Sequence, residues 1–396
     1  MKQTAQAAVV RMNELQQRID LLVGMRPSPH PVISVYLDLG QETGQLARFV
    51  RRRITACTNS IPAAQRARLR ACGESVIEQL FHEQAPHARG LAIFAAADGA
   101  APLLTVMPFA APFRNGLTVS SSPDIFPLLQ LREMYGRFTI VAAQPEGLQV
   151  AEVNLGEIAI RAWVATPQSQ SLMPESDDTP ATPAGVDIQP QIRLIERVLN
   201  KTRSDPLFLA GDVETMQRIR DLLAPNSIGR LVGAVPVPAD EPLQNIAARC
   251  LRSLMEFEAN QASELTARIL EEARHHGPAV TGPEASLRAL RTGAAERLLL
   301  GRDYRPEPGW TCGLCSEEST PRFRLQRAPG GVAETSEAVN LRVELVRLAG
   351  QRRVPVEFTG DDTLNDYGGV ACLLHDHPEQ TAQHLPPRYG SLDLVA

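Results

Sequence analysis

The stretch TGPEASLRALRTGAAERLLLG, residues 281–301, constrains the fold of this chain more than any other. Three of its apolar residues recur at helical spacing: Leu287, Leu290 and Ala294. Thr281 is followed three residues later by Glu284, so we expect a capping box at the start of this helix. Gly293 then ends the helix, and an apolar run bounded by Gly301 is typical of a buried strand. The stretch therefore predicts one α/β unit.

Further helix and strand patterns alternate along the chain. We expect strands over 32–39, 89–99 and 206–212, helices over 44–57, 62–83 and 334–350, and a three-stranded meander over 137–165. The segment 241–276 keeps its apolar residues three or four positions apart, which predicts either one long helix or a broken pair. A chain of 396 residues exceeds one ordinary core. The sequence therefore predicts a mixed α/β (α+β) protein of three consecutive α/β domains, 1–132, 133–276 and 277–396.

Positive charge is concentrated in residues 48–72, although the whole chain carries a net charge of −5. This range has seven arginines and no Asp or Glu: Arg48, Arg51, Arg52, Arg53, Arg66, Arg68 and Arg70. Guanidinium groups bind phosphate bidentately, and a range without carboxylates does not repel an RNA backbone. We expect that Arg51 and Arg52 cannot both face the same way as Arg48, so part of the set would be solvated surface. The range predicts an RNA contact on a basic helical hairpin. The alternative is a plain compositional preference, because the chain has only two lysines.

Of the six cysteines, only Cys312 and Cys315 form a pattern, the CxxC of half a zinc knuckle. A structural zinc site needs four ligands, and the nearest further candidates are Cys372 and His375. Cys372 falls in a predicted buried strand. The pattern therefore leaves two interpretations open, a zinc site and a metal-free turn, and no cofactor is required by the sequence.

The chain contains no run of about 18 uninterrupted apolar residues, the length that a membrane-spanning helix needs. Its first residues have Arg11 and Glu14 inside an apolar pattern, which indicates an amphipathic helix and not a signal peptide. We therefore expect a cytoplasmic protein without a membrane partner.

Two stretches in the last third of the chain resemble a known family. They are GPEASLRALRTGAAERLLL at 282–300 and, within 345–375, LVRLAGQRRVPVEFTGDDT with YGGVACLLH. Their pattern is similar to the third domain of the archaeo-eukaryotic peptide-chain release factor and Pelota family, in a divergent bacterial branch. The matching residues are Gly282, Leu287, Ala289, Leu290, Gly293, Ala294, Gly368 and Gly369. The physical roles expected of these glycines are a left-handed cap at Gly293 and a tight turn at Gly368 and Gly369.

The resemblance implies a domain order and a place for function. It implies an N-terminal domain with the arginine-rich hairpin and a central RNase H-like domain with an exposed loop at 166–187. It also implies a third domain like ribosomal protein L7Ae, an α/β/α sandwich, here with the CxxC insertion. Family members that hydrolyse peptidyl-tRNA carry a Gly-Gly-Gln tripeptide on the central loop. This chain has no Gly-Gly-Gln, and its loop is acidic, so we expect no peptidyl-tRNA hydrolysis.

The turn of the hairpin also departs from the family pattern. Stop-codon readers carry an Asn-Ile-Lys-Ser type motif there, whereas this chain has Thr58-Asn59-Ser60-Ile61-Pro62 without the lysine. Asn59 and Ser60 are therefore candidate RNA contacts by resemblance, and the alternative is that one of them caps the next helix.

Three functions follow from these observations. The first is a ribosome-associated factor that binds rRNA in the A site in ribosome rescue or hibernation, with a translational GTPase as a partner and as a monomer off the ribosome. The second is an enzyme, a peptidyl-tRNA hydrolase or tRNA-cleaving factor that uses other residues of the loop. The third is a protein-interaction module that no longer binds ribosomes.

Overall fold

The computed structural model describes residues 8–26, 28, 30–59, 63–82, 85–96, 103–165, 188–202, 205–305, 310–312, 325–327 and 341–375. These residues form a mixed α/β structure with several sheets, which confirms the fold class expected from the sequence. They divide into two compact units: unit 1 comprises 8–134 and 259–375, and unit 2 comprises 135–258. Within unit 1 we call 8–134 the N-terminal segment and 259–375 the C-terminal segment. The domain limits given above stay a prediction.

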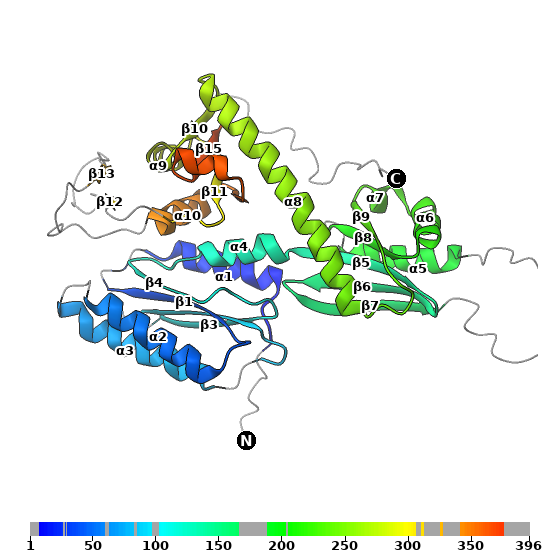
Figure 1. The fold of residues 1–396 in the computed structure, drawn as a ribbon, viewed down its shortest axis with the longest axis horizontal. Helices are drawn as coiled ribbons and strands as arrows, with labels where there is room; N and C mark the ends of the chain where they lie inside the picture. Colours follow the sequence, from blue (N-terminus) through cyan, green and yellow to red (C-terminus); the bar gives the residue numbers. More distant parts are fainter. Residues whose placement is uncertain are drawn as a thin grey trace, which may run out of the picture. The chain divides into compact units, whose positions relative to one another are not determined.

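The N-terminal segment is built on a four-stranded antiparallel sheet in the order β3-β2-β1-β4. Its strands are β1 (Val32–Asp38), β2 (Gly90–Ala96), β3 (Leu103–Phe109) and β4 (Gly116–Ser120). Helices α2 (Thr43–Asn59) and α3 (Ala63–Leu80) cover one face, and α1 (Met12–Gly24) and α4 (Phe126–Tyr135) lie on the other (Figure 1). Alternate residues of β1 point to the face covered by α2 and α3, where Ile33, Val35 and Leu37 join the core. The sheet thus holds the α2–α3 hairpin by its apolar side.

Unit 2 contains a five-stranded mixed sheet in the order β7-β6-β5-β8-β9. The predicted meander is confirmed as β5 (Arg137–Gln144), β6 (Gly147–Asn154) and β7 (Glu157–Ala165), and β8 (Leu207–Gly211) and β9 (Leu231–Pro236) continue the sheet in parallel. One face packs against α5 (Gln189–Leu199) and α6 (Val213–Leu222), followed by the short α7 (Pro225–Ile228). The other face packs against the first half of α8 (Leu243–Arg274), which is a single helix and not a broken pair.

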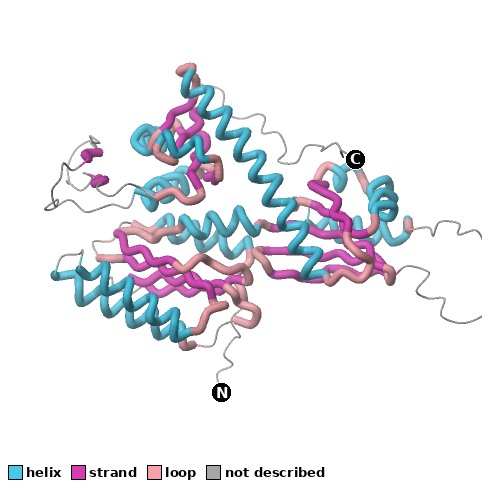
Figure 2. The backbone as a smooth tube through the Cα atoms, in the orientation of Figure 1, coloured by secondary structure: helices cyan, strands magenta, loops and turns pink. Residues whose placement is uncertain are grey.

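The C-terminal segment begins within α8 and has its own four-stranded sheet, in the order β10-β15-β11-β14. The strands are β10 (Ala279–Thr281), β11 (Ala295–Gly301), β14 (Val356–Thr359) and β15 (Val370–Leu374). Helices α9 (Pro283–Thr292) and α10 (Leu341–Arg352) and the 3-10 helix η3 (Asp362–Tyr367) accompany this sheet, and β12 (Trp310–Cys312) pairs with β13 (Leu325–Arg327) as a separate ribbon (Figure 2). Ile269 and Leu270 of α8 pack against Leu299 and Leu373 of the sheet. Among the described residues, no helix has the length and apolar character to cross a membrane.

The stretch 281–301 forms the predicted helix and strand, α9 and β11, but its predicted cap is wrong. Thr281 is the last residue of β10, where it pairs with Ala371, and Gly282 caps α9 with a φ of 88° and without a side-chain hydrogen bond. Thr281 is thus held in the sheet, which prevents its side chain from reaching the helix start. The expected left-handed cap at Gly293 is confirmed by a φ of 77°.

Replacement of Gly369 by alanine is expected to destabilise the C-terminal segment by about 2–3 kcal/mol. Gly369 has a φ of 71°, and an added Cβ would lie 2.9 Å from Cδ2 of the Tyr304 ring. Gly360→Ala is a matched control in the same segment, because a Cβ there meets nothing within 4 Å. Hydrogen exchange of the β15 amides measures the local stability of both variants. Equal protection in the two would contradict the role assigned to Gly369.

Candidate nucleic-acid interface

The arginine-rich hairpin, residues 48–72, lies on α2 and α3, which pack against each other and against one face of the N-terminal sheet (Figure 1). Leu46, Val50 and Ile54 recur every four residues on α2 and are buried, which is why this sequence forms an amphipathic helix. On α3 the buried residues include Leu69 and Val76. The apolar sides of both helices are therefore used by the core, and the arginines are left to the opposite sides.

All seven arginines of the hairpin are exposed to solvent. Arg51 and Arg52 follow Arg48 by three and four residues in one continuous helix, and residues at these spacings are neighbours on a helix surface. The expectation that these three arginines do not share a face is therefore wrong. The structure brings Arg48, Arg51 and Arg52 together on the exposed side of α2, and we call these three residues the α2 arginine cluster.

The α2 arginine cluster is not neutralised by the described part of the chain, within which none of its three members forms an ion pair. Like charges at these helical spacings repel each other by about 0.2–0.5 kcal/mol per pair. The cluster thus lowers the stability of α2 slightly, and an anionic partner would relieve this repulsion. Guanidinium groups bind phosphate bidentately, so such a cluster is a candidate phosphate-binding surface.

The arginines of α3 are divided between two sides of the helix. Arg66 and Arg70 are four residues apart and lie on one side, whereas Arg68 points to the other, where its Nη1 contacts the imidazole ring of His30. Nothing in the sequence pattern indicated His30, because it precedes β1 and is far from α3 along the chain. Arg68 therefore already has a contact within the protein. The α2 arginine cluster is the stronger candidate site for binding an anion from outside the protein.

The end of α2 carries a half-buried thiol and a buried hydroxyl. The Thr58 hydroxyl donates to the Ile54 carbonyl over 2.8 Å. Burial raises the pKa of the Cys57 thiol, and the positive charge of Arg53 opposes this in part. Asn59 is the last residue of α2, but its side chain and all of Ser60 lie outside the described residues, so their RNA-binding and capping roles stay predictions.

The candidate zinc ligands are not brought together by the described residues. Cys312 ends β12 without a described side chain, and Cys315 lies outside the described residues, as does the loop 166–187. Cys372 is fully buried in β15, where burial raises the pKa of its thiol to about 12 and the thiol donates to the Ser286 carbonyl over 3.9 Å. Cys372 is therefore a thiol of the core, and the described residues contain no group of three or more His, Cys, Asp or Glu side chains that could hold a metal ion. Zinc bound by Cys312 and Cys315 stays a prediction.

No protein-family model matches the sequence, and no curated protein matches it. Solved structures to which this chain is similar include the archaeal translation termination factor aRF1, with 14% identity, a TM-score of 0.27, and 93% of this chain and 99% of that chain covered. Pelota from Archaeoglobus fulgidus has 12% identity and a TM-score of 0.33, with 73% and 80% covered. Dom34 from S. cerevisiae, a translation termination-like factor, has 11% identity and a TM-score of 0.38, with 73% and 80% covered. These three solved structures are translation termination or Pelota proteins, and each is similar to this chain at low identity and low TM-score.

Proposed function

We propose that this protein is a ribosome-associated factor of the release factor and Pelota type, from a divergent bacterial branch. In this proposal it occupies the ribosomal A site during ribosome rescue or hibernation, acts in the cytoplasm, and does not hydrolyse peptidyl-tRNA. It is a monomer off the ribosome and has a translational GTPase as a partner. The assignment to this type rests on the residues of 282–300 and 345–375 that resemble the family's third domain.

The observation that carries the proposal is the α2 arginine cluster. The cluster presents three exposed guanidinium groups on one helix face, in a sequence range that contains no carboxylate. Such a surface attracts polyanions and does not repel them. A net charge of −5 for the whole chain means that this attraction is local. A protein with such a distribution is expected to bind RNA through one surface and to remain soluble in its free form.

The absence of hydrolysis in the proposal rests on the sequence. No Gly-Gly-Gln tripeptide occurs anywhere in the 396 residues, and the acidic range 175–187 would be repelled by rRNA. In this proposal the hairpin binds the ribosome, and the protein does not cleave the peptidyl-tRNA ester.

Sedimentation of the protein with ribosomes through a sucrose cushion, over a series of salt concentrations, tests the proposal. Neutralising about four phosphates with arginine gives a slope of about −3 in a plot of log K against log salt. We expect binding at low salt that weakens with this slope. A protein that stays in the supernatant at every salt concentration, with ribosomes from both growing and starved cells, would contradict the proposal and favour an interaction module without ribosome binding.

A peptide-release assay separates binding from hydrolysis. The protein is added to stalled ribosomes that carry a labelled peptidyl-tRNA, and the free peptide is measured. We expect sedimentation with these ribosomes without peptide release. Release that disappears when residues 168–187 are deleted would contradict the non-hydrolytic proposal.

A further inference from the structure

Strand β7 is the outermost strand of the sheet in unit 2, and it carries two exposed bulky apolar side chains (Figure 1). It pairs with β6, and among the described residues no strand lies along its other edge. Ile160 is 59% exposed and Trp163 is 50% exposed. An unpaired edge of this kind is a template for a further strand, and soluble proteins usually cover or charge such edges. We call the outer side of this strand, with Ile160 and Trp163, the β7 edge.

A β-bulge places both apolar side chains on the same face of the sheet. The partners of Ile160 and Trp163 on β6 are two residues apart, because Arg161 is an extra residue of β7 without a partner. These partners lie on the face of β6 that also carries Val153, which packs against α8. An ion pair holds the bulge, since Arg161 Nε donates to Glu152 Oε2 over 2.8 Å. Two residues that would otherwise point to opposite faces are thus presented together.

Helix α5 lies along the same edge of the sheet. It contacts β7, whereas α6 contacts β8 further inside the sheet. The Glu196 carboxylate of α5 accepts from the Ala224 amide over 2.9 Å and the Ser227 hydroxyl over 2.8 Å, so this side of α5 faces the residues that follow α6. Gln191 and Leu194 are three residues apart on the opposite side of α5. They therefore face outward, toward the β7 edge.

The Gln191 side chain has an unsatisfied acceptor on this side of α5. Gln191 is 6% exposed, and its Oε1 has no hydrogen-bond partner among the described residues. A buried amide oxygen without a donor costs free energy. Leu194 beside it is 45% exposed. This combination favours an occupant that has both apolar side chains and N–H donors, as a peptide has.

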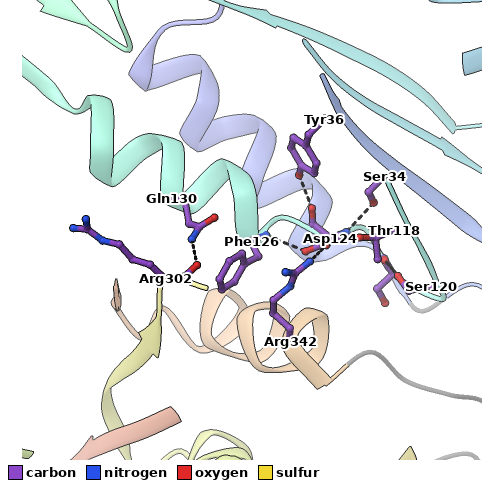
Figure 3. A network of polar contacts seen from close by, with 10 residues as sticks. Ser34, Tyr36, Thr118, Ser120, Asp124, Phe126, Gln130, Arg302 and Arg342 are labelled. Carbon is purple, nitrogen blue, oxygen red and sulfur yellow. Dashed lines mark hydrogen bonds and ion pairs between the residues drawn. The ribbon is translucent and has the colours of Figure 1, made fainter. Parts of the chain in front are cut away.

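A buried carboxylate in unit 1 shows the usual arrangement by contrast (Figure 3). Asp124 has no exposed surface. Its Oδ1 accepts from the Phe126 amide over 3.3 Å, and its Oδ2 accepts from the Thr118 hydroxyl over 2.9 Å and from the Arg342 guanidinium over 2.6 Å. Both oxygens of this side chain are thus satisfied inside the protein, whereas Oε1 of Gln191 is not.

The exposed charges around the β7 edge are positive. The exposed charged residues of β7 and α5 are Arg161, Arg193 and Arg197. Arg161 contacts Glu152, which points to the face covered by α5, as Val150 does two residues earlier. The arginines are therefore on the α5 face of the sheet, and the exposed apolar side chains are on the α8 face. A strand added at this edge would place alternate side chains on these two faces.

We propose that the β7 edge and the adjacent side of α5 bind an extended acidic peptide segment of another protein as an additional strand. Alternate side chains of this segment are apolar and cover Ile160 and Trp163, and the side chains between them are carboxylates that meet the arginines. Its N–H groups are the donors available to Gln191. The β7 edge belongs to unit 2 and the α2 arginine cluster to unit 1, so this binding does not depend on the proposed contact with RNA.

A titration of the full chain with a synthetic peptide tests the proposal. The peptide has nine residues, the length of β7, in which isoleucine and aspartate alternate, and it carries a fluorescent label whose anisotropy reports binding. We expect saturable binding that weakens with salt. A peptide of the same composition with its aspartates in one block should bind about tenfold more weakly or worse, because its side chains do not match the two faces.

A second measurement locates the peptide. The chain has two tryptophans, so Trp310→Phe leaves Trp163 as the only one. We expect the Trp163 emission to shift to shorter wavelength as the peptide binds, because the peptide removes water from the indole ring. Methylation of one alternate set of peptide amide nitrogens should abolish binding, and methylation of the other set should not, because only one set faces β7.

Matched variants separate the β7 edge from any other exposed apolar residue. Trp163→Ser and Ile160→Ser should each weaken binding about tenfold, since exposed apolar anchors dominate small interfaces. Leu104→Ser is the control, because Leu104 is 44% exposed on the edge strand β3 of unit 1, and it should leave binding unchanged.

Four results would overturn the proposal. They are no saturable binding of the alternating peptide, equal binding of the two peptides, equal losses in Trp163→Ser and Leu104→Ser, and a shift of the Trp163 emission by an RNA oligonucleotide in place of the peptide. A dimer of the full chain in light scattering that Ile160→Ser dissociates would also overturn it, since the β7 edge would then bind a second copy of this chain.

Discussion

Reversal of the α2 arginine cluster, Arg48→Glu with Arg51→Glu and Arg52→Glu, is expected to weaken ribosome binding by about a thousandfold or more at moderate salt. Each lost arginine–phosphate contact removes about 1.5 kcal/mol or more, and the new carboxylates are repelled by the phosphates. The slope of log K against log salt should become shallower by about 0.7 for each lost contact. All three side chains are exposed, so the fold should keep its stability. The variant also has like charges at the same spacings as the original, so the repulsion within α2 is retained.

The matched control for this variant carries the same change in charge on unit 2. Arg193, Arg197 and Arg252 are exposed and have no ion pair among the described residues, so Arg193→Glu with Arg197→Glu and Arg252→Glu changes the net charge equally. Binding measured by sedimentation over the same salt series should fall only slightly in the control. If both variants lost the same affinity for the ribosome, the loss would be due to net charge, and the hairpin would not be the contact surface.

The local elements of this fold were largely predictable because they depend on short-range patterns. The alternating and continuous apolar runs of β1, β5 and β8 identify buried strands, and the four-residue spacing on α2 identifies a helix. Short elements escaped detection: β4 and β10 have too few residues to show a period. The wrong capping prediction at Thr281 has the same origin, since the three residues of β10 determine what Thr281 can reach.

Contacts between distant residues could not be predicted from such patterns. Asp124 precedes α4 in a loop, and Arg342 lies in a helix that begins more than two hundred residues later. Neither position has a period, a motif or a charge run that indicates the other. The arginine-rich hairpin was found because its signal is compositional, whereas the grouping of Arg48, Arg51 and Arg52 depends on α2 being a regular helix through all three.

Replacement of Glu344 by glutamine is expected to destabilise the packing of α9 on α10 by about 3 kcal/mol. The Glu344 carboxylate accepts from the Arg347 Nε over 2.8 Å and Nη2 over 2.9 Å, and from the Arg291 Nη2 over 3.2 Å. The exposed fractions of these side chains are 9% for Glu344, 16% for Arg291 and 12% for Arg347. The glutamine amide keeps the volume of the carboxylate but removes the negative charge, so two poorly hydrated guanidinium groups would lose the carboxylate that they share.

The result is measurable as the free energy of opening from hydrogen exchange of the α9 and α10 amides, which does not require the whole chain to unfold in one step. Glu284→Gln is the matched control, since Glu284 pairs with Arg288 on the exposed side of α9 over 3.5 Å, with side chains 52% and 72% exposed. An exposed pair four residues apart contributes less than about 0.5 kcal/mol to stability. The control should therefore change the free energy of opening very little. A difference of less than about 1 kcal/mol between the two variants would contradict the structural role of Glu344.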